Sequence, residues 1–207
     1  MAHLLARAWA IFLACGAAVG QSCAMPDSSR ERTSIRPAGA GDAETIAAIH
    51  CESWRAVYRG ILPDGYLDRE VAGERRRYWS AALSAPAPGG FVLVAARGAD
   101  ILGFIAVARP GEPGYEAVID NLHVRPGLRG GRIGRRLLGA AAARLAAEGA
   151  ASACLRVFDA NKAAARFYRK LGGIADATGI DPFAGANMPD TRYGWRDLAA
   201  LAAACKG

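Results

Sequence analysis

The stretch Asn121-Leu-His-Val-Arg-Pro-Gly-Leu-Arg-Gly-Gly-Arg-Ile-Gly-Arg-Arg-Leu-Leu138 joins an apolar strand to an amphipathic helix through a turn rich in glycine and arginine. Glycine lets a backbone approach an anion closely, and the first N–H groups of the following helix carry about half a positive charge. Arginine side chains add full charges beside them. The turn therefore predicts a phosphate site, built from Gly127, Gly130, Gly131, Gly134, Arg129, Arg132, Arg135 and Arg136.

The spacing excludes the two common nucleotide motifs. The nucleotide loop ends in Gly-Lys-Ser/Thr, whereas Arg135 and Arg136 follow Gly134 here. The glycine positions also fail the G-x-G-x-x-G pattern of dinucleotide-binding folds. A different class of phosphate-bearing ligand is indicated.

The turn resembles the acetyl-CoA loop of the GNAT superfamily of N-acetyltransferases, Q/R-x-x-G-x-G/A, with Arg129 first, Gly134 last and Arg132 in place of the middle glycine. A second resemblance follows in Leu155-Arg-Val-Phe-Asp-Ala-Asn161, Phe167-Tyr168 and Lys170-Leu-Gly-Gly-Ile174. A third, Ser53-Trp-Arg-Ala-Val-Tyr-Arg-Gly-Ile-Leu-Pro-Asp-Gly-Tyr-Leu-Asp68, is similar to a segment of one bacterial subgroup of the superfamily. Together they cover residues 35–195.

The local patterns predict the order strand, two helices, three strands, helix, strand, helix and two strands. The expected strands are 33–36, 91–96, 101–108, 115–124, 152–157, a segment near 174 and 192–195, and the helices are 42–54, 66–84, 132–148 and 161–171. This order matches a single GNAT-like α/β (α+β) domain with a mixed central sheet and about four helices. Arg75, Arg76 and Arg77 are expected on a solvated helix face.

The resemblance implies acetyl-CoA as co-substrate and no metal. It assigns the phosphates to the loop residues Arg129, Gly130, Gly131, Arg132, Ile133, Gly134 and Arg135. It assigns the pantetheine arm to the backbone of Leu122, His123 and Val124 and to the side chain of Asn161. Asn161 is also placed to cap a helix, and both roles can hold together.

Acetyl transfer to an amine needs a neutral amine, a polarised carbonyl and a proton for the departing thiolate. By resemblance, Tyr168 supplies that proton. Many family members carry a glutamate where Val118 aligns, and Asp120 projects from the same strand face, so Asp120 is the predicted general base. Glu116, His123 and solvent are the alternatives.

The acceptor wall is expected, again by resemblance, at Trp54, Tyr58, Arg59 and Asp64. Glu52 and Asp64 are candidates to hold a cationic amine. The acceptor itself, a primary amine on a small molecule or on a protein or peptide, stays open.

Composition sets further bounds. A chain of 207 residues with 52% hydrophobic residues favours a single domain. The net charge of +7 fits an anionic ligand or nucleic acid, so a basic nucleic-acid-binding protein using residues 125–136 is one alternative. The five cysteines show no metal-ligand spacing and no disulfide framework, and Cys51 and Cys154 are expected to be buried small hydrophobes.

Residues 1–24 resemble a secretory signal, with an apolar run from Ala8 to Val19. Because acetyl-CoA is intracellular, we favour translation starting at Met25 and a cytoplasmic protein, and the alternative is an exported GNAT-like protein without catalytic activity. The expected organisation is an extension at 1–24, a flexible lead at 25–34, an acetyltransferase domain at 35–197 and a tail at 198–207. No membrane span and no nucleic-acid partner are expected, and the chain is expected to be a monomer or homodimer.

Overall fold

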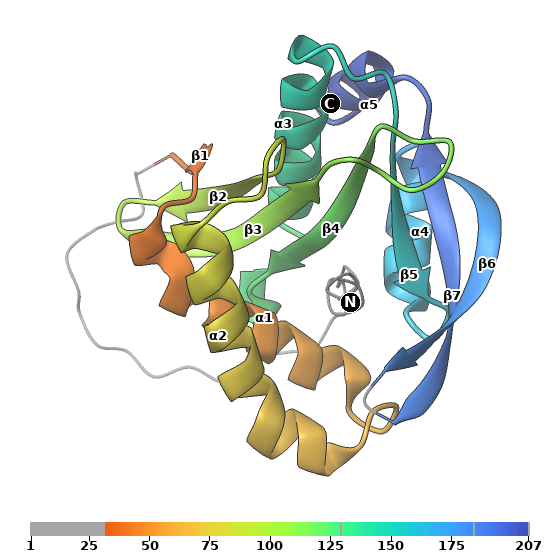
Figure 1. Cartoon of the computed structure of the whole chain (residues 1–207). Helices are drawn as coiled ribbons and strands as arrows, with labels where there is room; N and C mark the ends of the chain where they lie inside the picture. Colours follow the sequence, from red (N-terminus) through yellow and green to blue (C-terminus); the bar gives the residue numbers. More distant parts are fainter. Residues whose placement is uncertain (1–31, 129, 184, 207) are drawn as a thin grey trace.

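The computed structural model describes residues 32–128, 130–183 and 185–206 (Figure 1). They form one seven-stranded sheet in the order β1-β2-β3-β4-β5-β7-β6 and five α-helices, which confirms the predicted mixed α/β domain. The strands are β1 (Ser34–Pro37), β2 (Phe91–Arg97), β3 (Asp100–Ala108), β4 (Ala117–Val124), β5 (Ala153–Phe158), β6 (Ile174–Phe183) and β7 (Ala186–Trp195). The helices are α1 (Ala43–Tyr58), α2 (Val71–Ser84), α3 (Ile133–Ala147), α4 (Lys162–Lys170) and α5 (Leu198–Ala204).

The sheet has one parallel pair, β4 with β5, and its other neighbours are antiparallel. This parallel pairing is short, because it consists of Ala117 opposite Ala153 and Val118 opposite Cys154. Beyond Val118 the two strands diverge, and Figure 1 shows them spreading apart toward the C-terminal end of β4. The divergence leaves one backbone edge of β4 without a strand partner.

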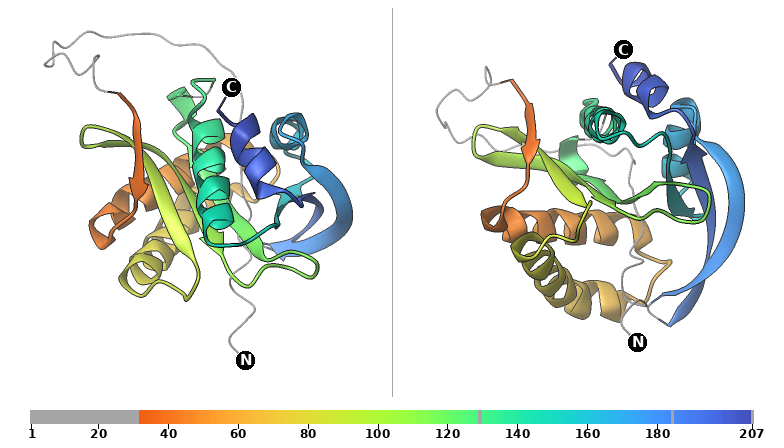
Figure 2. Two further views of the ribbon diagram at one scale, coloured as in Figure 1. Left: turned by 90° about the horizontal axis from the view of Figure 1, so that it is seen from above. Right: turned by 45° about the horizontal axis from the view of Figure 1, so that its top comes forward.

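The helices cover both faces of the sheet (Figure 2). Apolar side chains of α3, α4 and α5 meet one face in the largest buried cluster, which includes Leu137, Tyr168 and Leu201. On the other face, α1 and α2 bury Ile46 and Trp79 against Phe104 and other residues of β2 and β3. Each face thus has its own core, and β4 lies between them.

Several elements differ from their predicted bounds. Helix α1 extends to Tyr58, and the predicted helix 66–84 divides into a π-helical turn at Tyr66–Glu70 followed by α2. The last two strands form a hairpin of ten residues each, much longer than predicted. The expected tail contains α5, which Asp197 caps by accepting from the Ala200 N–H at 2.8 Å and which buries Leu198 and Leu201.

The prediction for Arg75 was wrong. Arg76 and Arg77 are exposed as expected, but Arg75 is only 8% exposed. Helical periodicity explains the difference, because Arg75 lies four residues after Val71 and four before Trp79, both of which face the interior. Arg75 therefore shares the inner face of α2.

The predicted extension 1–24, most of the lead 25–34 and Arg129 lie outside the described residues. Within the described ranges, no helix is long and apolar enough to cross a bilayer. Cys51 and Cys154 are buried free thiols, as predicted. Burial raises the pKa of the Cys154 thiol to about 11, which keeps it protonated at neutral pH.

Candidate active site

A β-bulge in β4 sets the position of Asp120. On β3, Val107 lies opposite Ile119 and the adjacent Ala106 lies opposite Asn121, so Asp120 is the extra residue between them. The bulge begins two residues beyond the last β4–β5 pair, where the strands start to diverge. Asp120 is therefore at the open edge of the sheet.

The Asp120 carboxylate accepts two hydrogen bonds at Oδ2. The Tyr78 hydroxyl donates across 3.2 Å and the Asn121 amide donates across 2.8 Å. Burial raises the pKa of Asp120 to about 7, although both donors and the Arg75 charge act to lower it. A carboxyl group with this pKa can take up a proton near neutral pH, as a general base must.

Asp120 and Tyr78 also line a cavity of about 250 Å³ between the C-terminal half of α2 and the sheet. Apolar side chains supply most of its remaining wall, including Trp79, Leu83 and Phe91. A carboxylate in such surroundings is poorly solvated, which is the physical cause of its raised pKa.

The alternative bases are engaged in other contacts. Glu116 Oε2 accepts from the backbone N–H groups of Ala151 at 2.7 Å and Ser152 at 3.2 Å, and so holds the start of β5. The His123 ring stacks on the His50 ring with centroids 4.3 Å apart, and both rings are buried. These contacts, and the raised pKa of the Asp120 carboxyl group, favour Asp120 as the base.

The predicted phosphate turn leads into α3. The first helical hydrogen bond runs from the Arg136 N–H to the Arg132 carbonyl at 2.9 Å, so the N–H groups of Ile133, Gly134 and Arg135 are not used inside the helix. A Cβ added at Gly127 or Gly130 would meet no atom within 4 Å, so space is open beside the turn. These features fit a pyrophosphate group.

Arg132 has a left-handed backbone, with φ of 60°, and follows the left-handed Gly130 at 87°. This conformation is rare for a side chain larger than glycine and costs about 1 kcal/mol. It explains physically why a glycine is usual at this position of the motif.

Two of the loop arginines turn toward other parts of the chain. The Arg135 guanidinium donates to the carbonyl of Ala204 beside α5, and Arg136 donates to the Thr33 carbonyl at 2.5 Å. In this arrangement Arg135 offers its backbone N–H to a phosphate, whereas its side chain links α3 to α5.

Asn161 caps α4, since its Oδ1 accepts from the Ala164 N–H at 3.1 Å. The predicted cap is confirmed, and the predicted contact with pantetheine stays a prediction. The Asn161 side chain also lies beside the Tyr58 hydroxyl, where it opposes the rise of the tyrosine's pKa caused by burial. Asn161 thus connects α4 with the end of α1.

Tyr168 lies on α4, on the β5 side of the divergence, and is fully buried. Its hydroxyl has no hydrogen-bond partner among the described residues. Burial, and secondarily the nearby Tyr58, raises the pKa of Tyr168 well above its usual value. The phenol therefore keeps its proton at neutral pH and points it at no acceptor of the described chain.

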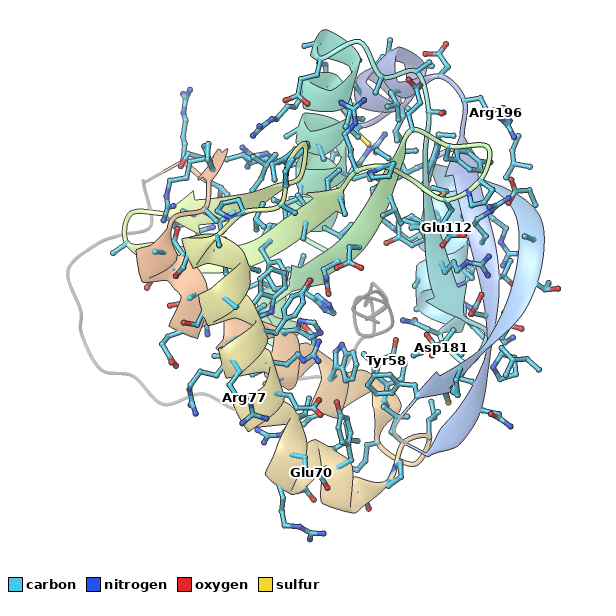
Figure 3. The ribbon with its side chains drawn as sticks, viewed as in Figure 1. Tyr58, Glu70, Arg77, Glu112, Asp181 and Arg196 are labelled. Carbon is cyan, nitrogen blue, oxygen red and sulfur yellow. The ribbon has the colours of Figure 1, made fainter. Side chains whose placement is uncertain are left out.

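The predicted acceptor residues separate into two groups. Trp54 and Tyr58 are buried and face the interior, with their rings 5.7 Å apart. Figure 3 shows Tyr58 directed inward from the end of α1. Arg59 instead pairs with Asp64 at 3.0 Å and Asp68 at 2.6 Å on the exposed side, so the structure does not bring Arg59 and Asp64 to the interior.

Glu52, the other candidate for holding an amine, forms a partly exposed ion pair with Arg125 at 3.8 Å. Both line an open depression between α1 and the turn at Pro126–Leu128. No group of three or more His, Cys, Asp or Glu side chains that could hold a metal is found in the described part of the chain.

Sequence reasoning missed three residues around Asp120: Tyr78, Arg75 and Asn121. The bond of Tyr78 to Asp120 joins segments 42 residues apart and leaves no local pattern. Arg75 could have been found from its spacing to Val71 and Trp79. Asn121 was visible beside Asp120, but its role depends on the bulge.

Known proteins resemble this chain in sequence and in fold. The N-acetyltransferase YuaI of Bacillus subtilis is 28% identical over 169 residues, which cover 81% of this chain and 95% of that protein. A GCN5-related N-acetyltransferase of Rhodopseudomonas palustris superposes with a TM-score of 0.65 at 24% identity, over 79% of this chain and 95% of that one. The PaiA N-acetyltransferase of Thermoplasma acidophilum, solved in complex with coenzyme A, gives a TM-score of 0.61 at 19% identity, over 80% and 99% of the two chains.

Residues 51–173, more than half of the chain, match the acetyltransferase (GNAT) family. The chain belongs to this family, whose members are acyltransferases. The predicted family, fold and enzyme class are thereby confirmed. The roles of individual residues remain predictions.

Proposed function

We propose that this protein transfers an acetyl group from acetyl-CoA to a primary amine by direct attack in a ternary complex. The observation that carries the proposal is the presence of two titratable groups beside the β4–β5 divergence: the partly buried Asp120 with a pKa of about 7, and the fully buried Tyr168 with its proton retained. Asp120 can accept a proton, and Tyr168 can supply one.

The donor site in this proposal is the turn before α3 together with the unpaired edge of β4. The N–H groups of Ile133, Gly134 and Arg135 hold the pyrophosphate. The backbone of Leu122, His123 and Val124 holds the pantetheine arm. The complex of the Thermoplasma neighbour with coenzyme A supports this assignment at the level of the shared fold.

The chemical step balances with these two side chains. The amine nitrogen forms a bond to the thioester carbon, and the carbon–sulfur bond breaks. The Asp120 carboxylate takes the proton that the amine loses, and Tyr168 gives its proton to the sulfur. A thiolate formed in the same buried surroundings is as poorly solvated as the phenolate, so burial does not prevent the transfer to sulfur. Solvent then restores both groups.

The cytoplasmic location expected from the sequence agrees with this proposal, because acetyl-CoA is an intracellular metabolite. The nucleic-acid alternative is less favoured. In the basic strip, the Arg135 side chain donates to the Ala204 carbonyl of α5, and the Arg136 side chain donates to the Thr33 carbonyl just before β1. No aromatic side chain lies within residues 125–136.

The direct test is a coupled assay of thiol release with acetyl-CoA and a panel of primary amines, with the N-acetyl product identified by mass. We expect product formation that falls strongly in Asp120→Asn and Tyr168→Phe. Thiol release that is no faster than without protein for every amine, from a folded protein, would refute the proposal.

A further inference from the structure

Arg75 is an unusual feature of the interior. The residue is 8% exposed, and its Nε and Nη1 atoms have no hydrogen-bond partner among the described residues. Within the described part of the chain, Arg75 Nη2 forms an ion pair with the Glu74 carboxylate at 3.6 Å. Most of its five hydrogen-bond donors are therefore without an acceptor.

Burial of a charged group without full pairing costs several kcal/mol, so the position of Arg75 needs a physical explanation. The guanidinium lies between two aromatic rings, 5.5 Å from the centre of Trp54 and 5.3 Å from that of Tyr78. These contacts offset part of the cost and fix the group in place. The rings offer no acceptor to the N–H groups in the plane of the guanidinium, so these N–H groups can hydrogen-bond a ligand.

Two neighbours of Arg75 also present donors without acceptors. Trp54 Nε1 has no hydrogen-bond partner among the described residues. His50 Nδ1 accepts from the Trp79 indole at 3.1 Å, and burial lowers the pKa of His50 well below its usual value, so the neutral ring carries its proton on Nε2. This Nε2 also lacks a partner within the described residues. We call His50, Trp54 and Arg75 the donor cluster.

Beside the bulge, the side chains present hydrogen-bond acceptors in place of donors. Asn121 donates its amide to Asp120, and its Oδ1 is a buried acceptor without a donor in the described chain. Tyr78 joins the two regions, because its ring lies against Arg75 and its hydroxyl bonds Asp120. The site thus has an accepting end at Asp120 and Asn121 and a donating end at the donor cluster, and the Tyr78 side chain contacts both ends.

Among the described residues, the charged groups near this region include Arg75 and Asp120 in the interior and Arg144, which lines the cavity beside Asp120. Glu74 lies at the rim, where its side chain is 39% exposed and accepts from the Tyr66 hydroxyl. His50 and His123 stack as a pair in the interior. The N–H groups of Arg75 Nε and Nη1, which lack acceptors among the described residues, therefore suit an anionic partner.

We propose that the acetyl acceptor is a small molecule with a primary amine at one end and an anionic group, in the simplest case a carboxylate, at the other, and that the donor cluster binds the anion. The inference rests on the proposed function, since the amine end is assigned from Asp120. The separation of the two ends favours an amine several bonds away from the carboxylate over an α-amino acid.

The anion site can be tested without turnover. Valerate and its neutral isostere valeramide are titrated into the full chain, and the N–H signals of the Arg75 Nε and the Trp54 indole are followed by NMR. We expect saturable shifts with valerate and none with valeramide. Arg75→Met should abolish the Trp54 shift, whereas Arg77→Met, a matched change on the exposed side of α2 (Figure 3), should retain it. No shift with valerate, or equal shifts with both compounds, would overturn the proposal.

Turnover separates this inference from the proposed function. With acetyl-CoA, kcat/KM for 5-aminovalerate should exceed that for pentylamine by about 10- to 100-fold, the range expected for hydrogen bonds to a charged group. Arg75→Met should bring the two values together, and glycine should be a poor acceptor. Equal use of both amines by the unaltered protein would refute the inference and leave the acetyltransferase standing. Valerate binding without transfer to any amine would leave the anion site standing and refute the proposed function.

Discussion

Tyr78 of α2 donates its hydroxyl hydrogen to Asp120 Oδ2 across 3.2 Å and so ties a helix of the acceptor side to the bulge of β4. The bond stabilises the carboxylate form of Asp120, against the larger effect of burial. Tyr78 is thus a positioning residue whose effect should be visible in the titration of Asp120.

Replacing Tyr78 by Phe removes this bond, and we expect the pKa of Asp120 to rise above its value of about 7. The carboxyl carbon signal of Asp120, followed by NMR over pH, reports the midpoint directly. Tyr66→Phe is the matched control, because it removes a 2.6 Å bond to Glu74 and leaves Asp120 untouched. An unchanged midpoint in Tyr78→Phe would mean that the bond does not influence the carboxylate.

Asp120→Asn should change how the stability of the protein depends on pH. The pKa of Asp120 is raised from 3.8 to about 7, so between these pH values the unfolded chain releases a proton that the folded chain keeps. Rising pH therefore lowers the free energy of unfolding in this window, and the stabilising contribution present below about pH 4 is lost as pH passes through 7. The Asn variant should lack this part of the pH dependence and should be the more stable protein at pH 8. Urea unfolding of both proteins from pH 4 to 8 measures it, and parallel curves would contradict the assignment.

The same substitution should change the rate profile. If Asp120 is the general base, kcat/KM rises with pH through about 7 and then levels, apart from any limb due to the amine itself, which lies near pH 10. Asp120→Asn should remove the lower limb. A lower limb that persists at the same pH would assign it to another group.

Arg132→Gly should stabilise the protein by about 0.5–1 kcal/mol, because glycine adopts the left-handed conformation at this position without strain. Acetyl-CoA affinity should be retained if the turn binds through its backbone. Thermal unfolding of the variant measures the change in stability, and a binding titration measures its affinity for acetyl-CoA. A large loss of affinity would show instead that the Arg132 side chain holds the ligand.

Glu112 holds the connection between β3 and β4 against the sheet, where Figure 3 labels it. It pairs with Arg156 at 2.9 Å and Arg192 at 3.5 Å, and the three side chains are 13–14% exposed. Glu112→Ala leaves partly buried cations with fewer partners and should cost about 3 kcal/mol. Glu44→Ala, which removes the exposed pair with Arg76, should cost less than about 1 kcal/mol. Equal losses in chemical unfolding would contradict this distinction.

The sequence predicted the core of the fold because its strands and helices carry strong local signals. The apolar runs of β2, β3 and β5 and the alanine-rich α3 were recognisable within a few residues of their bounds. The hairpin of β6 and β7 was mostly missed, since β6 is an edge strand in which no side chain is fully buried and which contains Gly179 and Pro182. Such a strand is defined by pairing with β7, which a local pattern does not contain.

The site was predictable where its backbone conformation requires particular residue types, and it was not predictable where it depends on tertiary contacts. The turn before α3 needs glycines, so it was visible in the sequence. The burial of Arg75 and the bond between Tyr78 and Asp120 arise when α2 packs on the sheet, and the arginine count alone favoured a solvated face. Trp54 and Tyr58, predicted by resemblance to form the acceptor wall, lie in the interior, whereas the outward pairing of Arg59 with Asp64 and Asp68 was not predicted.

The central claim is most directly tested by calorimetric titration of acetyl-CoA into the full chain, alongside the variants Gly134→Glu and Ser80→Glu. A Cβ added at Gly134 would make only ordinary contacts, 3.7 Å from the Val124 side chain and 3.9 Å from that of Phe167, so we expect the variant to fold. Its carboxylate would lie in the first turn of α3 and repel a pyrophosphate, whereas Ser80 is exposed on α2. We predict one site with micromolar affinity, competed by coenzyme A, weakened by Gly134→Glu and unchanged by Ser80→Glu. Absence of binding, or equal affinity in both variants, would contradict the account.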